Sequence, residues 1–283
     1  MGKWRRLTGA GITRSIKVAS LCSREREGFM LINIVAGLIT AALLAAGGLA
    51  LRHRKHLGLL RTTLTSGRLR VSVAALLRIK DDDGYVLIHH PFRPGVYGPP
   101  GGVVKYTDEA RGALDAVGFV EQRPAGRELT MRRDLRGFVP TRHGIGFLRW
   151  YDRCTGRESG PECLRRELRE ELSEAGHPEL APLAGKLRFE LIRSVVDGPR
   201  PTPGKQHRTM RSFEVYDPIL DSPEAVELRR RMLELAHDAA ETEIVLARVA
   251  DIEDGRREQF LISPQSAFLL STRRIHEDLP ALR

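Results

Sequence analysis

Hydrophobic and polar residues form two contrasting patterns along this chain. An uncharged run, GFMLINIVAGLITAALLAAGGLAL, extends from Gly28 to Leu51. After a basic connector at 52–68, short hydrophobic runs of strand type alternate with helix-type periodicity. This order predicts a mixed, layered α/β domain over 69–283, preceded by a basic segment at 1–28 and an apolar segment at 29–51.

The uncharged run predicts a single transmembrane helix over 29–51, because about 20 apolar residues span the hydrocarbon core. A signal peptide has a shorter apolar region, and a buried core helix does not fit the basic residues at both ends. Small residues recur at a spacing of four on two rows: Gly37, Ala41 and Ala45, and Ala42, Ala46 and Ala50. This pattern allows close helix packing in lipid, although an alanine-rich helix without a partner also fits it.

The two flanks of the run carry similar positive charge, with seven Lys/Arg in residues 1–28 and six in residues 52–70. The positive-inside rule therefore does not decide the orientation. If translation begins at Met30, the N-terminal charges are absent and the C-terminal domain is cytoplasmic. N-terminal sequencing that finds Met1 or Gly2 contradicts this hypothesis.

The main domain begins with strand-type runs at 69–79 and 85–90, which a DDDG turn at 81–84 is expected to join as a hairpin. A helix is predicted at 162–175, with Pro161 near its start and Gly176 just past its end. Further expected elements are a Gly/Pro loop and strand at 95–106, a helix at 108–116 capped by Thr107, strands containing FVP and FLRWY within 119–157, strands at 186–195, 211–216 and 241–249, a helix at 222–239, and a segment at 263–279 that ends helical.

The net charge of +10 comes from the N-terminal quarter of the chain. Residues 1–70 hold 13 Lys/Arg and two acids, whereas residues 71–283 hold 33 basic and 34 acidic residues. A near-neutral main domain disfavours a groove that neutralises many phosphates, so we expect no DNA or RNA partner. The cysteines show no disulfide or metal spacing, and we expect Cys154 and Cys163 to pack as small apolar groups.

Four acids lie at i, i+3, i+4 and i+7 on the predicted helix 162–175: Glu167, Glu170, Glu171 and Glu174. This spacing places them on one helical face, where like charges repel. A hard cation such as Mg²⁺ would offset the repulsion. A solvated face neutralised by neighbouring arginines is the alternative.

The run Arg166-Glu167-Leu168-Arg169-Glu170-Glu171 resembles the REUxEE core of the Nudix box, and Glu158 stands at the family's spacing before it. The Gly-Pro-Pro-Gly-Gly run at 98–102 resembles the loop that precedes this box. The resemblance implies a Nudix-like α/β/α sandwich in which Glu158, Glu167, Glu170 and Glu171 hold Mg²⁺. It further implies that Glu170 and Glu171 act on the attacking water and that Arg166 orients a glutamate.

Several positions depart from the Nudix pattern. Asp152 and Ser173 replace two of its glycines, and an insertion at about 103–157 separates the Gly-Gly pair from the box. The insertion holds 11 Lys/Arg against seven acids, together with Trp150 and Tyr151. These residues either contact phosphates and bases or are ordinary surface arginines and core aromatics. Further candidate ligand contacts are Arg132, Arg133, Trp150 and Arg208.

A single transmembrane helix joined to an insertion-bearing Nudix domain resembles the transmembrane-Nudix effectors of bacterial cyclic-oligonucleotide antiphage systems (CBASS). This resemblance implies a single-pass protein of the cell inner membrane with a cytoplasmic domain that senses a cyclic di- or trinucleotide made by a CD-NTase. Ligand binding would make the helices oligomerise and disrupt the lipid bilayer, causing abortive infection. A membrane-anchored, Mg²⁺-dependent Nudix hydrolase of nucleoside diphosphate derivatives and a degenerate, structural Nudix fold are the alternatives.

Overall fold

The computed structural model describes residues 67–122 and 132–279, together with Gly37 and Thr40. The chain divides into two units, Met1–Arg54 and Lys55–Arg283, and nearly all of the described residues belong to the second. Gly37 and Thr40 are helical. The rest of the predicted transmembrane helix at 29–51 lies outside the described residues, as do the segment at 1–28 and most of the connector. Within the described part of the chain, no helix is long and apolar enough to cross a membrane.

The first mixed sheet is built around β1 (Arg68–Leu77). Strand β9 (Arg208–Ile219) runs parallel to one edge of β1, and β8 (Arg188–Pro201) runs antiparallel to β9. Two strands share the other edge: β7 (Arg136–Pro140) pairs with the first half of β1, and β5 (Gly101–Val103) pairs with the second half. Strand β6 (Val120–Glu121) completes this sheet beside β7.

The second mixed sheet has β3 (Gly84–His89) near its centre. Its strands follow the order β10 (Ile244–Arg248), β3, β4 (Val96–Gly98), β12 (Phe260–Ile262) and β11 (Arg256–Arg257), and β2 (Lys80–Asp81) also pairs with β3.

A hairpin was predicted between strands at 69–79 and 85–90, and its first strand was predicted wrongly. The short β2 pairs with β3, whereas β1 lies in the other sheet. Arg78 explains the separation, because its backbone N–H donates to Tyr216 O at 2.8 Å and its guanidinium bonds both oxygens of Asp217 at 2.6 Å. These contacts bind the end of β1 to β9 before the chain turns.

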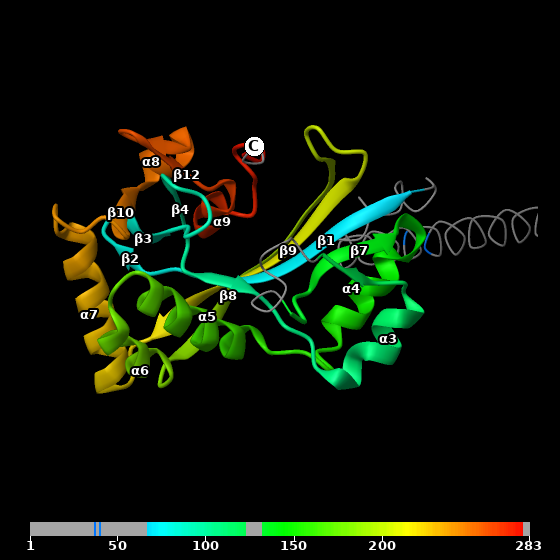
Figure 1. Ribbon diagram of the computed structural model, residues 1–283, viewed down its shortest axis with the longest axis horizontal. Coiled ribbons are helices and arrows are strands. Elements are labelled where there is room, and N and C mark those ends of the chain that lie inside the picture. The colour runs from blue at the N-terminus through cyan, green and yellow to red at the C-terminus, as the bar shows by residue number, and fades with distance from the viewer. Residues whose placement is uncertain (1–36, 38–39, 41–66, 123–131, 280–283) are drawn as a thin grey trace, which may run out of the picture. The chain divides into compact units, whose positions relative to one another are not determined.

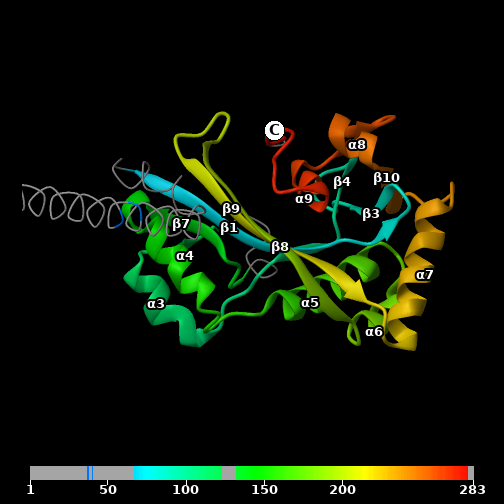
Figure 2. The same ribbon diagram turned by 180° about the vertical axis from the view of Figure 1, so that it is seen from behind.

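Helices cover both sides of β1, with α4 and α5 on one side and α8 and α9 on the other (Figures 1 and 2). The α-helices are α3 (Arg111–Ala116), α4 (Gly144–Asp152), α5 (Gly160–Glu174), α6 (Ala181–Ala184), α7 (Pro223–His237), α8 (Val249–Asp254) and α9 (Ala267–Leu270). Short 3₁₀ turns lie at Asp108–Ala110, Thr141–His143, Pro178–Leu180 and Pro264–Ser266.

The side chains of β1 pack alternately into two hydrophobic cores. The odd-numbered residues face the larger core with α4, α5 and α7: Leu69, Val71, Val73, Ala75 and Leu77. Ala74 and Leu76 belong instead to the smaller core with α8 and α9. This alternation follows from the two-residue period of a strand. The layering agrees with the predicted mixed α/β domain.

Some element predictions are confirmed and others are wrong. The FVP segment lies in β7, but FLRWY forms α4, because Phe147, Leu148, Trp150 and Tyr151 are buried together on one helical face. Residues 108–116 are helical, but the Thr107 side chain makes no cap hydrogen bond. The helix expected to end the segment 263–279 stops at Leu270, where Ser271 becomes extended.

The insertion at 103–157 is part of the domain rather than an appendage. It adds β6 and β7 to the first sheet. Strand β7 pairs with the first half of the β1 edge whose second half pairs with β5, and the insertion also carries α3 and α4. Trp150 and Tyr151 are buried in the larger core, so the interpretation of these two as core aromatics is correct. Cys163 is buried as expected, whereas Cys154 is exposed in a turn with a positive φ, and its predicted packing is wrong.

Candidate functional site

The acidic helix α5 begins at a capping box. Ser159 Oγ accepts from the Glu162 N–H at 3.3 Å, and the Ser159 N–H donates to Glu162 Oε2 at 2.7 Å. These bonds satisfy donors that a helix N-terminus otherwise leaves without partners. They fix the start of α5 directly after Glu158, so the capping box also places that carboxylate.

Helix α5 has two neighbouring faces, one of which packs into the larger core while the other carries carboxylates. Leu164, Leu168 and Leu172, spaced by four residues, are fully buried against the larger core. The face beside them carries the predicted carboxylates, of which Glu170 is 53% exposed. Burial of the leucine row therefore holds the acidic face along the edge of β5 rather than in open solvent.

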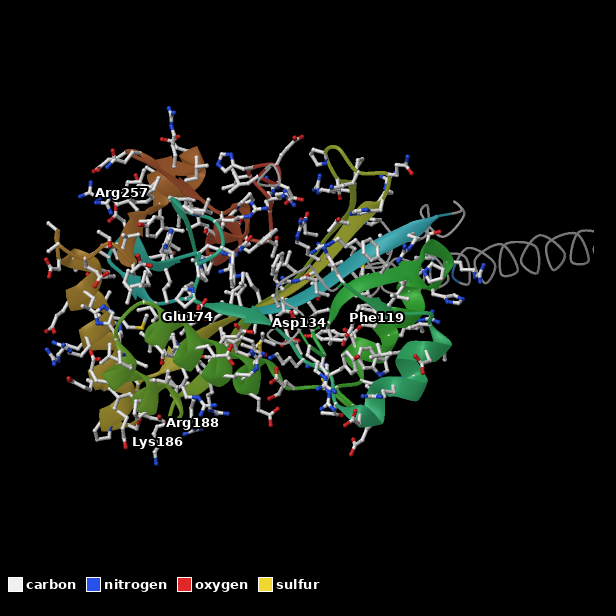
Figure 3. All side chains as sticks on the ribbon, viewed as in Figure 1. Phe119, Asp134, Glu174, Lys186, Arg188 and Arg257 are labelled. Carbon is white, nitrogen blue, oxygen red and sulfur yellow. The ribbon has the colours of Figure 1, made fainter. Side chains whose placement is uncertain are left out.

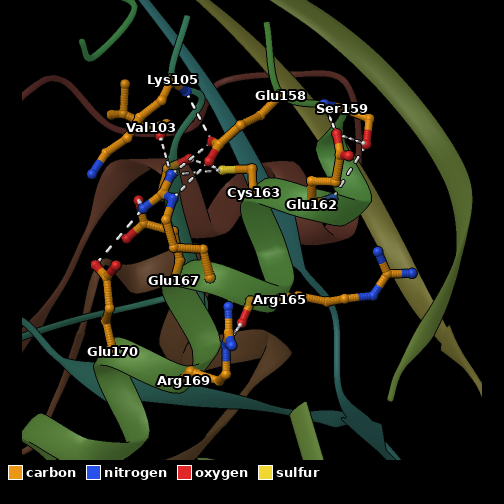
Figure 4. A network of polar contacts seen from close by, with 12 residues as sticks. Val103, Lys105, Glu158, Ser159, Glu162, Cys163, Arg165, Glu167, Arg169 and Glu170 are labelled. Carbon is orange, nitrogen blue, oxygen red and sulfur yellow. Dashed lines mark hydrogen bonds and ion pairs between the residues drawn. The ribbon is translucent and has the colours of Figure 1, made fainter. Parts of the chain in front are cut away.

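Arg166 is the centre of a polar network that connects this face to the preceding loop. Its partners Val103, Glu158 and Glu167 are labelled in Figure 4. Its Nε and Nη2 donate to the two oxygens of Glu158 at 2.9 Å each, and Nη1 donates to Glu167 Oε1 at 2.6 Å. Nη2 also donates to the Val103 carbonyl at 3.0 Å. Glu158 Oε2 accepts a further bond from the Lys105 N–H at 3.0 Å. The predicted orienting ion pair of Arg166 is thus present, and Glu158 is its main partner.

The Gly-Gly pair that precedes the insertion lies directly against α5. The Gly101 N–H donates to Glu171 Oε2 at 2.9 Å, and Gly101 has a φ of +124°, which favours glycine. A Cβ on Gly102 would overlap the Glu167 carboxylate. The two glycines therefore allow the backbone of β5 to approach the carboxylates closely, although the insertion separates them in sequence.

Burial changes the ionisation of two of these carboxyl groups. Desolvation raises the pKa of Glu167 and raises the pKa of Glu171 well above its ordinary value. The Glu167 charge adds to the shift at Glu171, whereas the Gly101 N–H opposes it. Carboxylates crowded at low dielectric are stabilised by a cation.

The donor set suits Mg²⁺ in type, because hard cations prefer carboxylate oxygens. In the described part of the chain, however, no three such side chains are gathered into a preformed metal cluster. Both oxygens of Glu158 already accept hydrogen bonds. Glu167, Glu170 and Glu171 are therefore better placed than Glu158 to bind a metal ion, and Glu158 is held by Arg166 in this conformation.

A cavity of about 360 Å³ lies beside the acidic face. Its acidic part is formed by four residues of α5: Glu167, Glu170, Glu171 and Glu174. Besides Arg166 of α5, three arginines line the cavity from strands of the first sheet: Arg70 on β1, Arg136 on β7 and Arg211 on β9. The rim includes His90 and Phe92, and Phe92 is 45% exposed. Asp134 and Glu174, which both line this cavity, are labelled near the middle of Figure 3.

The basic part of this cavity was not predicted from the sequence. The cavity is not lined by the ligand contacts predicted from the sequence, which were Arg132, Arg133, Trp150 and Arg208. Arg133 pairs with Asp108 at 2.7 Å. The only signal for Arg70 was its place in an alternating strand, opposite in face to Leu69 and Val71.

The sequence pattern of one protein family, described as SMODS-associated NUDIX domain, matches residues 68–270. The chain belongs to this family. No curated protein and no solved structure was found to match it. Membership links the Nudix domain to a nucleotide second-messenger system of the CBASS type.

Two departures of this Nudix domain from the usual box have local explanations. Asp152, in place of a glycine, is the last residue of α4, so a helix of the insertion occupies the start of the usual loop. Ser173 also replaces a glycine, and its exposed hydroxyl donates to the Arg169 carbonyl at 2.8 Å within α5. Both changes are compatible with the Arg166 network.

Proposed function

We propose that this chain is a membrane effector of a cyclic-oligonucleotide antiphage system. Its Nudix domain senses a cyclic di- or trinucleotide that a CD-NTase produces. The transmembrane helix at 29–51 then oligomerises and disrupts the inner membrane, which causes abortive infection. The protein is single-pass, and its Nudix domain is cytoplasmic.

The cavity beside α5 is the observation that carries this proposal. Its lining combines carboxylates, arginines and an aromatic rim, which are the groups that recognise metal ions, phosphates and bases. The insertion supplies Asp134 and Arg136 to this lining. Part of the ligand surface therefore comes from a segment that interrupts the usual Nudix loop, and this favours a ligand different from that of an ordinary Nudix hydrolase.

The uncharged run supports the membrane part of the proposal. It is 24 residues long, and its rows of small residues offer a packing surface for a second copy of the helix. Charge in the main domain is close to balanced, which suits one small phosphorylated ligand better than a long nucleic acid.

A Mg²⁺-dependent Nudix hydrolase is the second candidate, and it is supported by one cavity that Glu167, Glu170, Glu171 and Arg166 all line. Glu167, Glu170 and Glu171 would hold the metal, which supplies positive charge to a phosphate group. Arg166 would keep Glu167 oriented. The two functions are compatible if the domain hydrolyses the signal that it senses.

Full-length protein in dye-loaded liposomes distinguishes the two functions. Cyclic di- and trinucleotides are added in Mg²⁺, dye release is followed, and the nucleotide is recovered by chromatography. The effector proposal predicts dye release with the nucleotide returned unchanged. Turnover that the double variant Glu170→Gln, Glu171→Gln abolishes, and that exposed Glu109→Gln retains, supports the hydrolase instead.

A second variant tests the helix itself. Ala41→Leu adds bulk to a row of small residues, so dye release should weaken while nucleotide binding stays at the wild-type level. Equal dye release from the variant and the wild type would contradict a role for this helix face.

A further inference from the structure

Three arginines converge on one face of the first sheet because of its strand order. Ser72 of β1 lies opposite Arg136 of β7 on one side and opposite Arg211 of β9 on the other. Arg70 precedes Ser72 by two residues and therefore projects from the same face of β1. Diagonal neighbours on adjacent strands are about 7–8 Å apart, within reach of long side chains.

This face is the one that β1 turns toward the cavity. Arg70, Ser72, Ala74 and Leu76 all line it, whereas the odd-numbered residues between them are buried in the larger core. The positions of Arg136 and Arg211 in the register explain why they line the same cavity. The arginines are thus part of a concave surface that already includes the acidic face of α5.

The arginines have polar partners, but their positive charges still repel one another. Arg70 Nε donates to Gln122 Oε1 at 2.7 Å, and Arg211 Nη2 donates to Asp278 Oδ2 at 2.7 Å. Burial, with added repulsion from Arg136 and Arg211, lowers the pKa of Arg70 to about 10. Asp278 partly offsets this repulsion. An additional anion at this face would relieve it further.

We propose that Arg70, Arg136 and Arg211 form a phosphate-binding subsite that takes a phosphodiester or diphosphate group of a nucleotide ligand. Guanidinium groups recognise phosphate oxygens through paired, charge-assisted hydrogen bonds. The class of ligand rests on the proposed function, whereas the arginine cluster itself follows from the strand order.

The rest of the cavity fits the same ligand class. Mg²⁺ is commonly held by one or two carboxylates together with ligand phosphates, so carboxylates and arginines in one cavity are complementary rather than opposed. Phe92 and His90 at the rim offer ring faces on which a base can stack. Arginines from β1, β7 and β9 would bind the phosphate, and the glutamates of α5 would hold its metal ion.

Binding of inorganic pyrophosphate to the full-length protein tests the subsite without a known nucleotide. Calorimetry is carried out in EDTA, so that metal on α5 does not contribute, and is repeated with Arg70→Gln, Arg136→Gln and Arg211→Gln. Each variant should bind about tenfold more weakly than the wild type. Arg149→Gln removes the same charge from an exposed position on α4 and should bind like the wild type.

Thermal unfolding checks that each variant is folded, and Arg→Lys variants replace any Gln variant that is not. Lysine keeps the charge but loses the paired donors, so pyrophosphate should still bind several-fold more weakly. Failure of the wild type to bind millimolar pyrophosphate overturns the subsite, as does equal binding by wild type and all variants.

A panel of cyclic di- and trinucleotides separates this inference from the proposed function. Pyrophosphate binding that depends on the arginines, without binding of any cyclic nucleotide, supports the subsite and overturns the proposed sensor. Cyclic-nucleotide binding that is equal in the wild type and the three arginine variants supports the sensor and overturns the subsite.

Discussion

Arg166 holds Glu158 through two parallel hydrogen bonds, with Nε and Nη2 each 2.9 Å from a different carboxylate oxygen. The pair is partly buried, with 16% of the arginine side chain and 22% of the glutamate side chain exposed. It joins α5 to the end of the insertion, and the same arginine also holds Glu167 and the Val103 carbonyl. The Arg166 side chain thus holds both Glu158 and strand β5 against the acidic face of α5.

Arg166→Gln should lower the free energy of unfolding by about 3 kcal/mol, because it leaves two partly buried carboxylates without their counter-ion. Arg166→Lys should recover only part of this loss, since lysine cannot form the paired bonds to Glu158. Urea unfolding of the full-length protein measures both. Arg169→Gln, on the exposed side of α5, is the control and should change stability by less than about 0.5 kcal/mol. Similar losses at residues 166 and 169 would contradict the central role of Arg166.

Gly102→Ala should weaken Mg²⁺ binding about tenfold, because the added Cβ displaces the Glu167 carboxylate from its place beside β5. Isothermal titration with Mg²⁺ measures the change. Gly112→Ala in α3 is a matched control, since a Cβ there meets nothing within 4 Å. The control should bind Mg²⁺ like the wild type, and equal weakening in both variants would count against a metal site at Glu167.

Asp134→Asn should reduce the loss of stability as pH rises from 4 toward 7. Burial raises the pKa of Asp134 from 3.8 to about 7, and the Glu167 charge adds to this shift. The folded state therefore holds the proton more tightly than the unfolded state. The resulting stabilisation is complete below pH 3.8 and is lost as pH rises through about 7. Asparagine does not titrate, so this loss, roughly 2–4 kcal/mol, should be absent from the variant.

Urea unfolding of the full-length protein at several pH values between 4 and 8 measures this effect. Asp115→Asn, at an exposed position on α3, serves as the control and should keep the pH dependence of the wild type. A wild type and an Asp134→Asn variant with the same pH dependence would show that this carboxyl group titrates normally.

Asp278→Asn should strengthen pyrophosphate binding several-fold. The Asp278 carboxylate bonds Arg211 at 2.7 Å and also bonds Arg274, so it supplies negative charge close to the arginine cluster. Removal of that charge leaves Arg211 more attractive to an anion. Glu277→Gln removes an equal charge from the neighbouring residue and serves as the control. Weaker binding by Asp278→Asn would indicate that this carboxylate mainly positions Arg211.

Local patterns were sufficient for much of the acidic face. Helix α5 is predicted by its strong helix formers, Pro161 and Gly176, and the spacing of Glu167, Glu170 and Glu171 follows directly from helical periodicity. The pattern of FLRWY does not distinguish a strand from a buried helix, because a short apolar run fits both equally well until its burial is known. The hydrogen bonds of Arg166 to both Glu158 and Glu167 depend on how the segment before α5 packs against the helix.

The sequence by itself determined a near-neutral α/β domain after an uncharged run, and a helix with a Nudix-type acidic face. Only the tertiary structure decided that Gly101 and Gly102 contact that face across the insertion, and that Arg70, Arg136 and Arg211 share one cavity. The physical reason is that helical periodicity is local, whereas these contacts depend on which strands pair with β1. Strand pairing joins residues far apart in the chain, and no local pattern specifies it.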